Sequence, residues 1–256
     1  MVGSWTATSS SVALTDMDPF LSVVIPFRNE EPSLALLHSE LAEVLDAFPF
    51  ESEMIFVDDE SGDGGSGVVR DLAGLDSRIR LLTLLPHSGQ SAALGAGFRA
   101  ARGELIATLD ADLQNVPGDL PRLIEALDQA DCVCGVRVSR QDSMIKRLAS
   151  RIANGVRRFV LADGVHDIGC SLRVMRASSL KRIKLFRGGH RFLPSLLAME
   201  GARVIELPVD HRARLHGSSN YGVGGRLVAG LVDLLAVFWM KKRSDRFEVK
   251  EFTRRV

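Results

Sequence analysis

Two carboxylates stand one residue apart in the segment Asp110-Ala111-Asp112-Leu113-Gln114, directly after the apolar run 105–109. Carboxylate oxygens are hard ligands of the kind that Mg²⁺ and Mn²⁺ prefer in proteins. A divalent cation held there could bridge a diphosphate and offset the negative charge that grows as the diphosphate departs. The pair is also compatible with a solvated turn, so its neighbours must decide between the two interpretations.

Two further polar clusters follow apolar runs earlier in the chain. Residues 26–30 read Pro-Phe-Arg-Asn-Glu, and residues 58–64 read Asp-Asp-Glu-Ser-Gly-Asp-Gly. A third segment, 87–93, combines Gly, Gln, Ser and Ala. Each cluster alone is typical of a turn, but all of them lie where a predicted strand has just ended or a helix is about to begin.

The elements that would position these clusters alternate along the first half of the chain. Apolar runs at 21–25, 54–57, 79–84 and 105–109 predict buried strands, and apolar residues at helical spacing predict helices over 32–48, 90–101 and around 120–127. This alternation predicts a single α/β domain with a Rossmann-like, mostly parallel central sheet covered by helices. Such sheets bind ligands at the carboxyl ends of their strands, where the polar clusters lie.

In this order, the three strand-end clusters and the segment 87–93 resemble the family 2 glycosyltransferases. Three later segments, 135–137, 167–173 and 211–221, are similar to those of the polyprenyl-phosphate glycosyltransferases. The resemblance runs from about Leu21 to Met240 and implies a GT-A fold, with the glycosyltransferase domain over residues 21–225. It also implies transfer of a sugar from a GDP- or UDP-sugar to a polyprenyl monophosphate, with inversion at the anomeric carbon.

The resemblance further implies a role for individual residues. Mg²⁺ or Mn²⁺ would be held by Asp110, Asp112 and Gln114, and the catalytic residues would be Asp112 and Arg137. The nucleotide-sugar would be bound by Pro26, Arg28, Glu30, Val57, Asp59, Asp110, Ala111, Asp112, Arg214 and Asn220. The acceptor phosphate would meet Arg137, Lys146, Arg147, Ser150 and Arg173. Arginine suits these positions because its planar fork binds phosphate bidentately, although Arg173 could equally be an ion-pair partner. Asn220 stands where the family usually has Lys.

The two ends of the chain have a different character. Residues 1–20 are rich in Ser and Thr and contain no Lys or Arg, so we expect a disordered leader rather than a secretory signal. The longest apolar stretch, Leu227 to Met240, is interrupted by Asp233 and is shorter than the roughly 20 residues of a spanning helix. We therefore expect residues 226–256 to form an amphipathic, membrane-associated segment.

Three cysteines are too few for a disulfide scaffold, which fits a reducing compartment.

Charge divides the chain in two. Residues 1–136 carry 7 basic and 22 acidic side chains, and residues 137–256 carry 25 basic and 10 acidic ones. Helical spacing over 143–162 places an apolar arc that includes Val156 and Phe159 opposite a basic arc of Lys146, Arg147, Arg151, Arg157 and Arg158. That basic arc would face either solvent or an anionic surface.

We expect a protein on the cytoplasmic face of an anionic membrane, with room for a separate membrane-spanning subunit as partner. Aromatic residues make up 6% and no nucleic-acid module is recognisable, so nucleic acid is not expected as a partner.

Two other functions are compatible with the same motifs. A family 2 transferase acting on a saccharide hydroxyl in cell-envelope synthesis would need a general base, and Asp167 is the one candidate. A phosphate monoester is already anionic and needs none. A non-catalytic nucleotide-sugar-binding subunit of a membrane complex is favoured by Asn220 and disfavoured by the intact segment 110–114.

Overall fold

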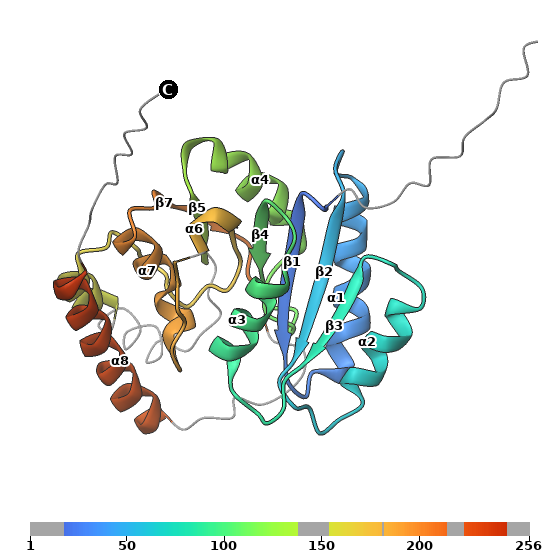
Figure 1. Ribbon diagram of the computed structural model, residues 1–256, viewed down its shortest axis with the longest axis horizontal. Coiled ribbons are helices and arrows are strands. Elements are labelled where there is room, and N and C mark those ends of the chain that lie inside the picture. Colours follow the sequence, from blue (N-terminus) through green and yellow to red (C-terminus); the bar gives the residue numbers. More distant parts are fainter. Residues whose placement is uncertain (1–17, 138–153, 181, 214–222, 245–256) are drawn as a thin grey trace, which may run out of the picture.

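The computed structural model describes residues 18–137, 154–180, 182–213 and 223–244, with no side chains described for 223–228 (Figure 1). Its seven strands form one sheet in the order β3-β2-β1-β4-β6-β5-β7. They are β1 (Leu21–Phe27), β2 (Ser52–Asp58), β3 (Ile79–Thr83), β4 (Leu105–Thr108), β5 (Cys132–Arg137), β6 (Arg173–Arg176) and β7 (Val204–Val209). The four strands predicted from apolar runs are confirmed.

Most neighbouring strands run parallel. β1 pairs in parallel with β2 and β4, β2 with β3, and β5 with β7, whereas β6 is antiparallel to both β4 and β5. The strand order reverses between β1 and β4, because the chain first builds outward through β2 and β3 and then returns to the other side of β1. In open α/β sheets, ligands bind at such a switch point, beyond the carboxyl ends of the strands.

Helices cover both faces of the sheet. α1 (Glu31–Asp46), α2 (Gly65–Ala73) and α4 (Leu120–Glu125) pack on one face, and α3 (Gln90–Ala100) and α7 (Leu193–Met199) pack on the other. Alternate residues of β1 serve the two faces, since Val23 and Ile25 join the first apolar cluster and Val24 joins the second. Short helical turns complete the layers: η1 (Pro117–Asp119), η2 (Ala126–Gln129), α6 (Ala177–Leu180) and η3 (Gly189–Phe192). The single α/β domain with a mostly parallel sheet is therefore confirmed.

An outer layer is added by α8 (Val223–Arg243), which lies at the edge of the molecule beside α7 (Figure 1). Its Leu234 and Val237 are buried in a third apolar cluster with Leu161, Phe192 and Leu196. The boundary expected at residue 225 falls inside this helix. No helix of the described part of the chain combines the length and apolar character needed to cross a membrane. Residues 1–17 and 245–256 lie outside the described residues.

The helical segment 154–161 corrects the faces predicted for the 143–162 helix. Phe159 and Val156, predicted on the apolar arc, are 90% and 45% exposed, whereas Arg157, predicted on the basic arc that would face solvent or an anionic surface, is 2% exposed. The Arg157 guanidinium is held inside by the Asp163 carboxylate at 2.7 Å and by the Val165 carbonyl. The ion pair with Asp163, which lies beyond the end of the helix, buries Arg157. The helix therefore has a different face buried from the one that its periodicity indicated. Residues 143–153 lie outside the described residues.

Candidate functional site

Asp58 and Asp59 at the end of β2 organise the loops around them. Asp58 accepts hydrogen bonds from the backbone N–H of Ser61, at 2.9 Å, and from the Ser66 hydroxyl. Asp59, which is 4% exposed, accepts from the backbone N–H groups of Ser88 and Gly89 at 2.7 and 2.8 Å. The carboxylate predicted to contact the nucleoside therefore fixes the loop that leads into α3.

The loop after β1 is tied to the loop after β2. Asn29, with φ of 56°, places its side-chain oxygen 2.7 Å from the Gly62 N–H, and its own N–H donates to Ser61 Oγ at 3.0 Å. Among the residues predicted here, Pro26 is buried, Arg28 is exposed and Glu30 is half-buried. The Val57 side chain lies in the apolar cluster under α3, so only its backbone is available to a ligand.

The segment after β4 doubles back on itself. Leu113 has φ of 61°, and Ala111 and Leu113 are buried in the core. Asp110 Oδ1 accepts from Gln90 Nε2 of α3 at 2.7 Å, and Asp112, 5% exposed, accepts from the Gln114 N–H at 3.2 Å. Both carboxylates are thus held at the switch point between β1 and β4.

His211 joins this segment from the far end of the chain. A backbone bridge pairs Asn115 with His211, the Arg212 N–H donates to the Gln114 carbonyl at 2.9 Å, and His211 Nε2 lies 3.4 Å from Gln114 Nε2. The sequence motif 211–221 contained His211 but did not indicate this contact. The signal available was its position directly after β7, the strand next to β5.

A donor set for a hard cation is present around this loop. The described residues contain no group of three or more His, Cys, Asp and Glu side chains that could hold a metal. The carboxylates of Asp110 and Asp112 with the Gln114 amide instead form an oxygen-rich set, which suits Mg²⁺ or Mn²⁺ rather than Zn²⁺. The chemistry of these side chains is that of a site for such a cation, and their joint binding of it stays a prediction.

A pocket of about 170 Å³ opens between β1, β4, α3 and η3. Three of the predicted site residues line it: Pro26, Asp110 and Arg173. Gln90, His190 and Arg191 line it as well. One carboxylate, that of Asp110, and two guanidinium groups, those of Arg173 and Arg191, therefore share one cavity.

Arg173 is a buried cation in the lining of this pocket. It is 4% exposed, and its two Nη groups donate to the backbone carbonyls of His190 and Ile168, both at 2.9 Å. None of the ion pairs found among the described residues involves Arg173, and its Nε is buried without a hydrogen-bond partner. Because a buried charge is costly without a counter-ion, this environment favours binding of an anion.

His190 is a pocket residue that sequence reasoning missed, because Gly188-Gly189-His190 reads as a turn. Its Nδ1 lies 2.8 Å from Ser91 Oγ, and its backbone N–H donates to the same Oγ at 3.2 Å. Burial, and then the nearby Arg191 and Arg173, lower the pKa of His190 to about 3. The imidazole is therefore neutral at physiological pH.

Arg137 and Asp167 form a bidentate pair next to the pocket. Arg137 Nε and Nη2 lie 2.7 and 2.8 Å from the two Asp167 oxygens, and Asp167 also accepts from the Gly169 N–H at 3.1 Å. Arg137 is not among the residues that line the pocket. Outside the described residues lie Lys146, Arg147 and Ser150, predicted for the acceptor phosphate, and Arg214 and Asn220, predicted for the nucleotide-sugar.

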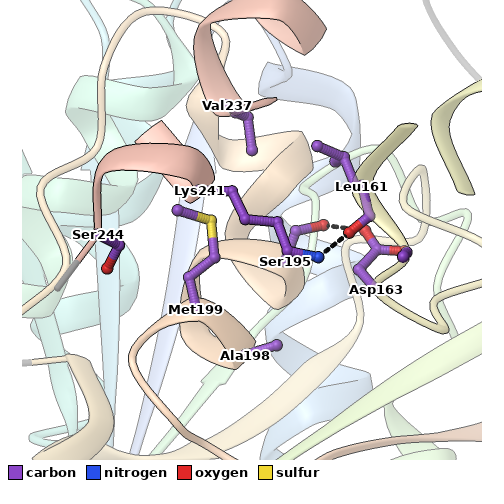
Figure 2. Close-up of a pocket in the computed structure, with 9 residues that line it drawn as sticks. Leu161, Asp163, Ser195, Ala198, Met199, Val237, Lys241 and Ser244 are labelled. Carbon is purple, nitrogen blue, oxygen red and sulfur yellow. Dashed lines mark hydrogen bonds between the residues drawn. The ribbon is translucent and has the colours of Figure 1, made fainter. Parts of the chain in front are cut away.

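A second pocket, of about 370 Å³, lies between residues 161–163, α7 and α8 (Figure 2). Lys241 donates there to the Leu161 carbonyl, and the Ser195 hydroxyl donates to the Asp163 carboxylate (Figure 2). These bonds connect α8 and α7 to the end of the helical segment 154–161. No predicted site residue lines this pocket, so we place the candidate site in the smaller pocket at the switch point.

The chain is similar to known proteins in both sequence and structure. Residues 22–184 match the family described as Glycosyl transferase family 2. A dodecaprenyl-phosphate galacturonate synthase of Rhizobium johnstonii is 38% identical over 232 residues, which cover 88% of this chain and 68% of the relative. An undecaprenyl-phosphate 4-deoxy-4-formamido-L-arabinose transferase of Edwardsiella ictaluri is 40% identical over 206 residues, which cover 80% and 63%. The chain thus spans about two thirds of the length of these relatives.

Solved structures share the architecture at low sequence identity. The glucosyl-3-phosphoglycerate synthase of Mycobacterium tuberculosis, in complex with Mn²⁺, UDP and glucosyl-3-phosphoglycerate, superposes with a TM-score of 0.63 at 16% identity, covering 89% of this chain and 81% of that one. The same enzyme with Mg²⁺ and UDP gives a TM-score of 0.64 at 15% identity, with the same coverage. These likenesses establish the GT-A fold predicted from the sequence. With its sequence match over most of its length and this fold, the chain belongs to glycosyl transferase family 2.

Proposed function

We propose that this protein transfers a sugar from a nucleotide-sugar to a polyprenyl monophosphate, with inversion at the anomeric carbon. The relatives at 38% and 40% identity are named for reactions on dodecaprenyl and undecaprenyl phosphate, which supports this acceptor class. We propose a GDP- or UDP-sugar as the class of donor and a polyprenyl monophosphate as the class of acceptor.

The observation that carries the proposal is the charge distribution of the pocket at the switch point. Asp110 and the buried Arg173, which takes part in none of the ion pairs found among the described residues, line the same pocket of about 170 Å³. A donor diphosphate would be neutralised by a cation held near Asp110, and an acceptor phosphate would be neutralised by Arg173. A sugar between the two anions would be placed for transfer from one to the other.

The reaction is a single displacement. An acceptor phosphate oxygen attacks the anomeric carbon, a new carbon–oxygen bond forms, and the bond from that carbon to the diphosphate breaks. The products are the lipid-linked sugar phosphate and the nucleoside diphosphate, and no proton must be removed from an anionic phosphate. Positioning and charge stabilisation therefore supply most of the rate.

Different residues of the chain would bind the metal, the donor and the acceptor. Asp110, Asp112 and Gln114 would hold Mg²⁺ or Mn²⁺, which when bound neutralises charge on the departing diphosphate. Pro26, Arg28, Glu30, Asp59 and the backbone of Val57 would border the nucleoside. Arg173 would hold the acceptor phosphate, and Arg137 would add further N–H donors beside it, since only two of its five face Asp167. Lys146, Arg147, Ser150, Arg214 and Asn220 remain proposed contacts.

A membrane location follows from the acceptor, which is a lipid. We place the protein peripherally on the cytoplasmic face of an anionic membrane. The exposed side chains Leu231, Val232, Leu235 and Trp239 of α8, followed by Lys241, Lys242 and Arg243, support this placement. The outward face of α8 could also receive a separate membrane-spanning subunit.

Asp167 bears on the rival acceptor, a saccharide hydroxyl. As a general base it would have to be available to that hydroxyl, but both of its oxygens accept hydrogen bonds from Arg137. This favours a lipid phosphate, which needs no base. A non-catalytic subunit is disfavoured by the ordered carboxylates of Asp110 and Asp112.

One assay tests the proposal. The protein is incubated with undecaprenyl phosphate in detergent, Mg²⁺ or Mn²⁺, and a panel of radiolabelled UDP- and GDP-sugars, and label is counted after extraction into organic solvent. We expect label in the organic phase for at least one donor, abolished by a metal chelator. Label that appears only in free or polymeric saccharide would support the rival acceptor, and no transfer with any donor would support the non-catalytic role.

A further inference from the structure

The first turn of α3 connects two walls of the candidate site. Gln90 donates to Asp110, and the next residue, Ser91, lies 2.8 Å from His190 Nδ1 through its hydroxyl. Ser91 is 5% exposed, and its Oγ also accepts the His190 backbone N–H at 3.2 Å. His190 is thereby held against α3 from both its backbone and its ring.

The hydrogen bonds indicate which ring nitrogen carries the proton. The buried Ser91 hydroxyl needs an acceptor for its own hydrogen, and His190 Nδ1 is the acceptor within reach. If Nδ1 accepts, the neutral ring carries its hydrogen on Nε2. Since Nδ1 is committed to Ser91, the Nε2 edge is the part of the ring available to the pocket that His190 lines.

The backbone of His190 already serves the fold without the imidazole. Its carbonyl accepts from Arg173 at 2.9 Å, and its N–H donates to Ser91. η3 is further anchored by Phe192, which is 4% exposed in the third apolar cluster. These anchors leave the Nε2–H group as the one polar function of the ring that the fold does not use.

We infer that His190 Nε2–H donates a hydrogen bond to an oxygen of the transferred sugar and so helps to determine which sugar the protein accepts. The inference rests on the proposed function, in which the sugar lies between a donor diphosphate near Asp110 and an acceptor phosphate at Arg173. An uncharged donor suits a hydroxyl oxygen, whereas the two phosphate groups would be bound by arginines or by a cation. A donor in a buried pocket discriminates strongly against a sugar that leaves it unpaired.

Two substitutions separate this role from a structural one. His190→Asn places an amide oxygen near the Nδ1 position, which keeps the Ser91 contact and removes the donor at Nε2. His190→Gln reaches the Nε2 position with an amide N–H₂ and restores the donor. Calorimetric titrations with Mn²⁺ compare UDP-glucose with UDP, and GDP-mannose with GDP, for the wild type and both variants without any acceptor lipid.

We expect the wild type to bind one nucleotide-sugar more tightly than its parent diphosphate. His190→Asn should lose about three- to tenfold in affinity for that nucleotide-sugar, the loss of one neutral hydrogen bond, with no change for the diphosphate. His190→Gln should retain most of the difference.

Three results would overturn the inference. They are equal weakening of sugar and diphosphate in His190→Asn, unchanged affinity for both, and a wild type that never distinguishes a nucleotide-sugar from its diphosphate. Because no acceptor is present, these outcomes are separate from a failure of lipid transfer, which the extraction assay reports.

Discussion

At the scale of single residues, Asp112 combines burial with a fixed orientation. It is 5% exposed in a loop that Leu113, in the left-handed region, turns back on itself. We expect Asp112→Asn to reduce transfer by at least a thousandfold, because an amide keeps the shape but removes the charge that a divalent cation requires. The measurement is lipid-linked label per unit time at saturating Mn²⁺, with circular dichroism as a check of folding. Turnover at the wild-type rate by a folded Asp112→Asn protein would refute the metal assignment.

Arg173 leads to a corresponding prediction for the acceptor phosphate. Arg173→Gln removes the buried charge, and we expect the KM for undecaprenyl phosphate to rise about tenfold or more, the effect of one charge-assisted hydrogen bond. Arg173→Lys keeps the charge and should recover part of that affinity. The KM for the nucleotide-sugar serves as internal control, since Arg173 is proposed to bind the acceptor. A rise in the KM for the nucleotide-sugar alone would mean that Arg173 binds the donor and not the acceptor.

His190 predicts a pH dependence of stability. Its folded pKa of about 3 lies below the value of roughly 6.5 in an unfolded chain. Between these values the unfolded chain binds a proton that the folded protein does not, so stability falls as the pH drops from about 6.5. At pH 5 this amounts to about 2 kcal/mol. Urea unfolding at pH 7 and pH 5 should show a smaller loss in His190→Asn than in the wild type, and an equal loss would contradict the buried neutral ring.

At the scale of elements, apolar runs and periodicity predicted the first half of the sheet and its helices. Buried parallel strands are continuous apolar runs, and polar clusters mark their carboxyl ends, so the loops around Pro26, Asp59 and Asp110 could be located in advance. The contact between His211 and Gln114 could not, because it depends on β7 reaching the same edge from almost a hundred residues away. The buried His190 was also unpredictable, since a histidine that follows two glycines gives no periodic signal.

The helical segment 154–161 shows how an ion pair can override an amphipathic pattern. Arg157 and Asp163 are 3% and 5% exposed as side chains, and the Ser195 hydroxyl donates to the same carboxylate. We expect Arg157→Ala to lower the free energy of unfolding by about 3 to 5 kcal/mol, because it leaves Asp163 buried without its partner. Arg158→Ala is the matched control, since Arg158 is the next residue and is exposed, and it should change stability by less than about 0.5 kcal/mol. Similar small effects of both substitutions in urea unfolding would contradict the buried pair.

At the scale of the whole molecule, the charge asymmetry of the sequence has a spatial counterpart. The acidic first half builds β1 to β4 and the loops that carry Asp110 and Asp112, whereas the basic second half builds the Arg173 end of the pocket and α8. One acidic residue, Asp233, lies in the part of α8 whose side chains are described, and it packs against Gly188 on the inner side, where burial raises its pKa. The outward side of α8 is therefore apolar and ends in basic residues.

This arrangement predicts salt-sensitive binding to anionic membranes through α8. Leu235 and Trp239 are 64% and 63% exposed one helical turn apart, and Lys242 lies over the Phe238 ring at 5.7 Å. Inserting the two apolar side chains contributes about 2 to 3 kcal/mol, and each basic residue near an anionic surface adds about 1 kcal/mol. We expect the double variant Leu235→Ser/Trp239→Ser to bind vesicles with 30% phosphatidylglycerol about 30- to 150-fold more weakly.

Flotation of full-length protein with liposomes at 0.05 and 0.5 M salt measures both contributions, because salt screens the charges and leaves the apolar insertion. Leu75→Ser is the matched control, since Leu75 is 86% exposed just after the end of α2. Figure 1 shows α2 and α8 at opposite sides of the molecule. Equal binding of wild type and the α8 double variant would mean that another surface meets the membrane. Equal binding to neutral and anionic vesicles would contradict the proposed attraction of the basic residues at the end of α8 to anionic lipid. If the double variant alone loses binding and also loses lipid transfer, while its affinity for the nucleotide-sugar is unchanged, then α8 acts by bringing the pocket to the acceptor.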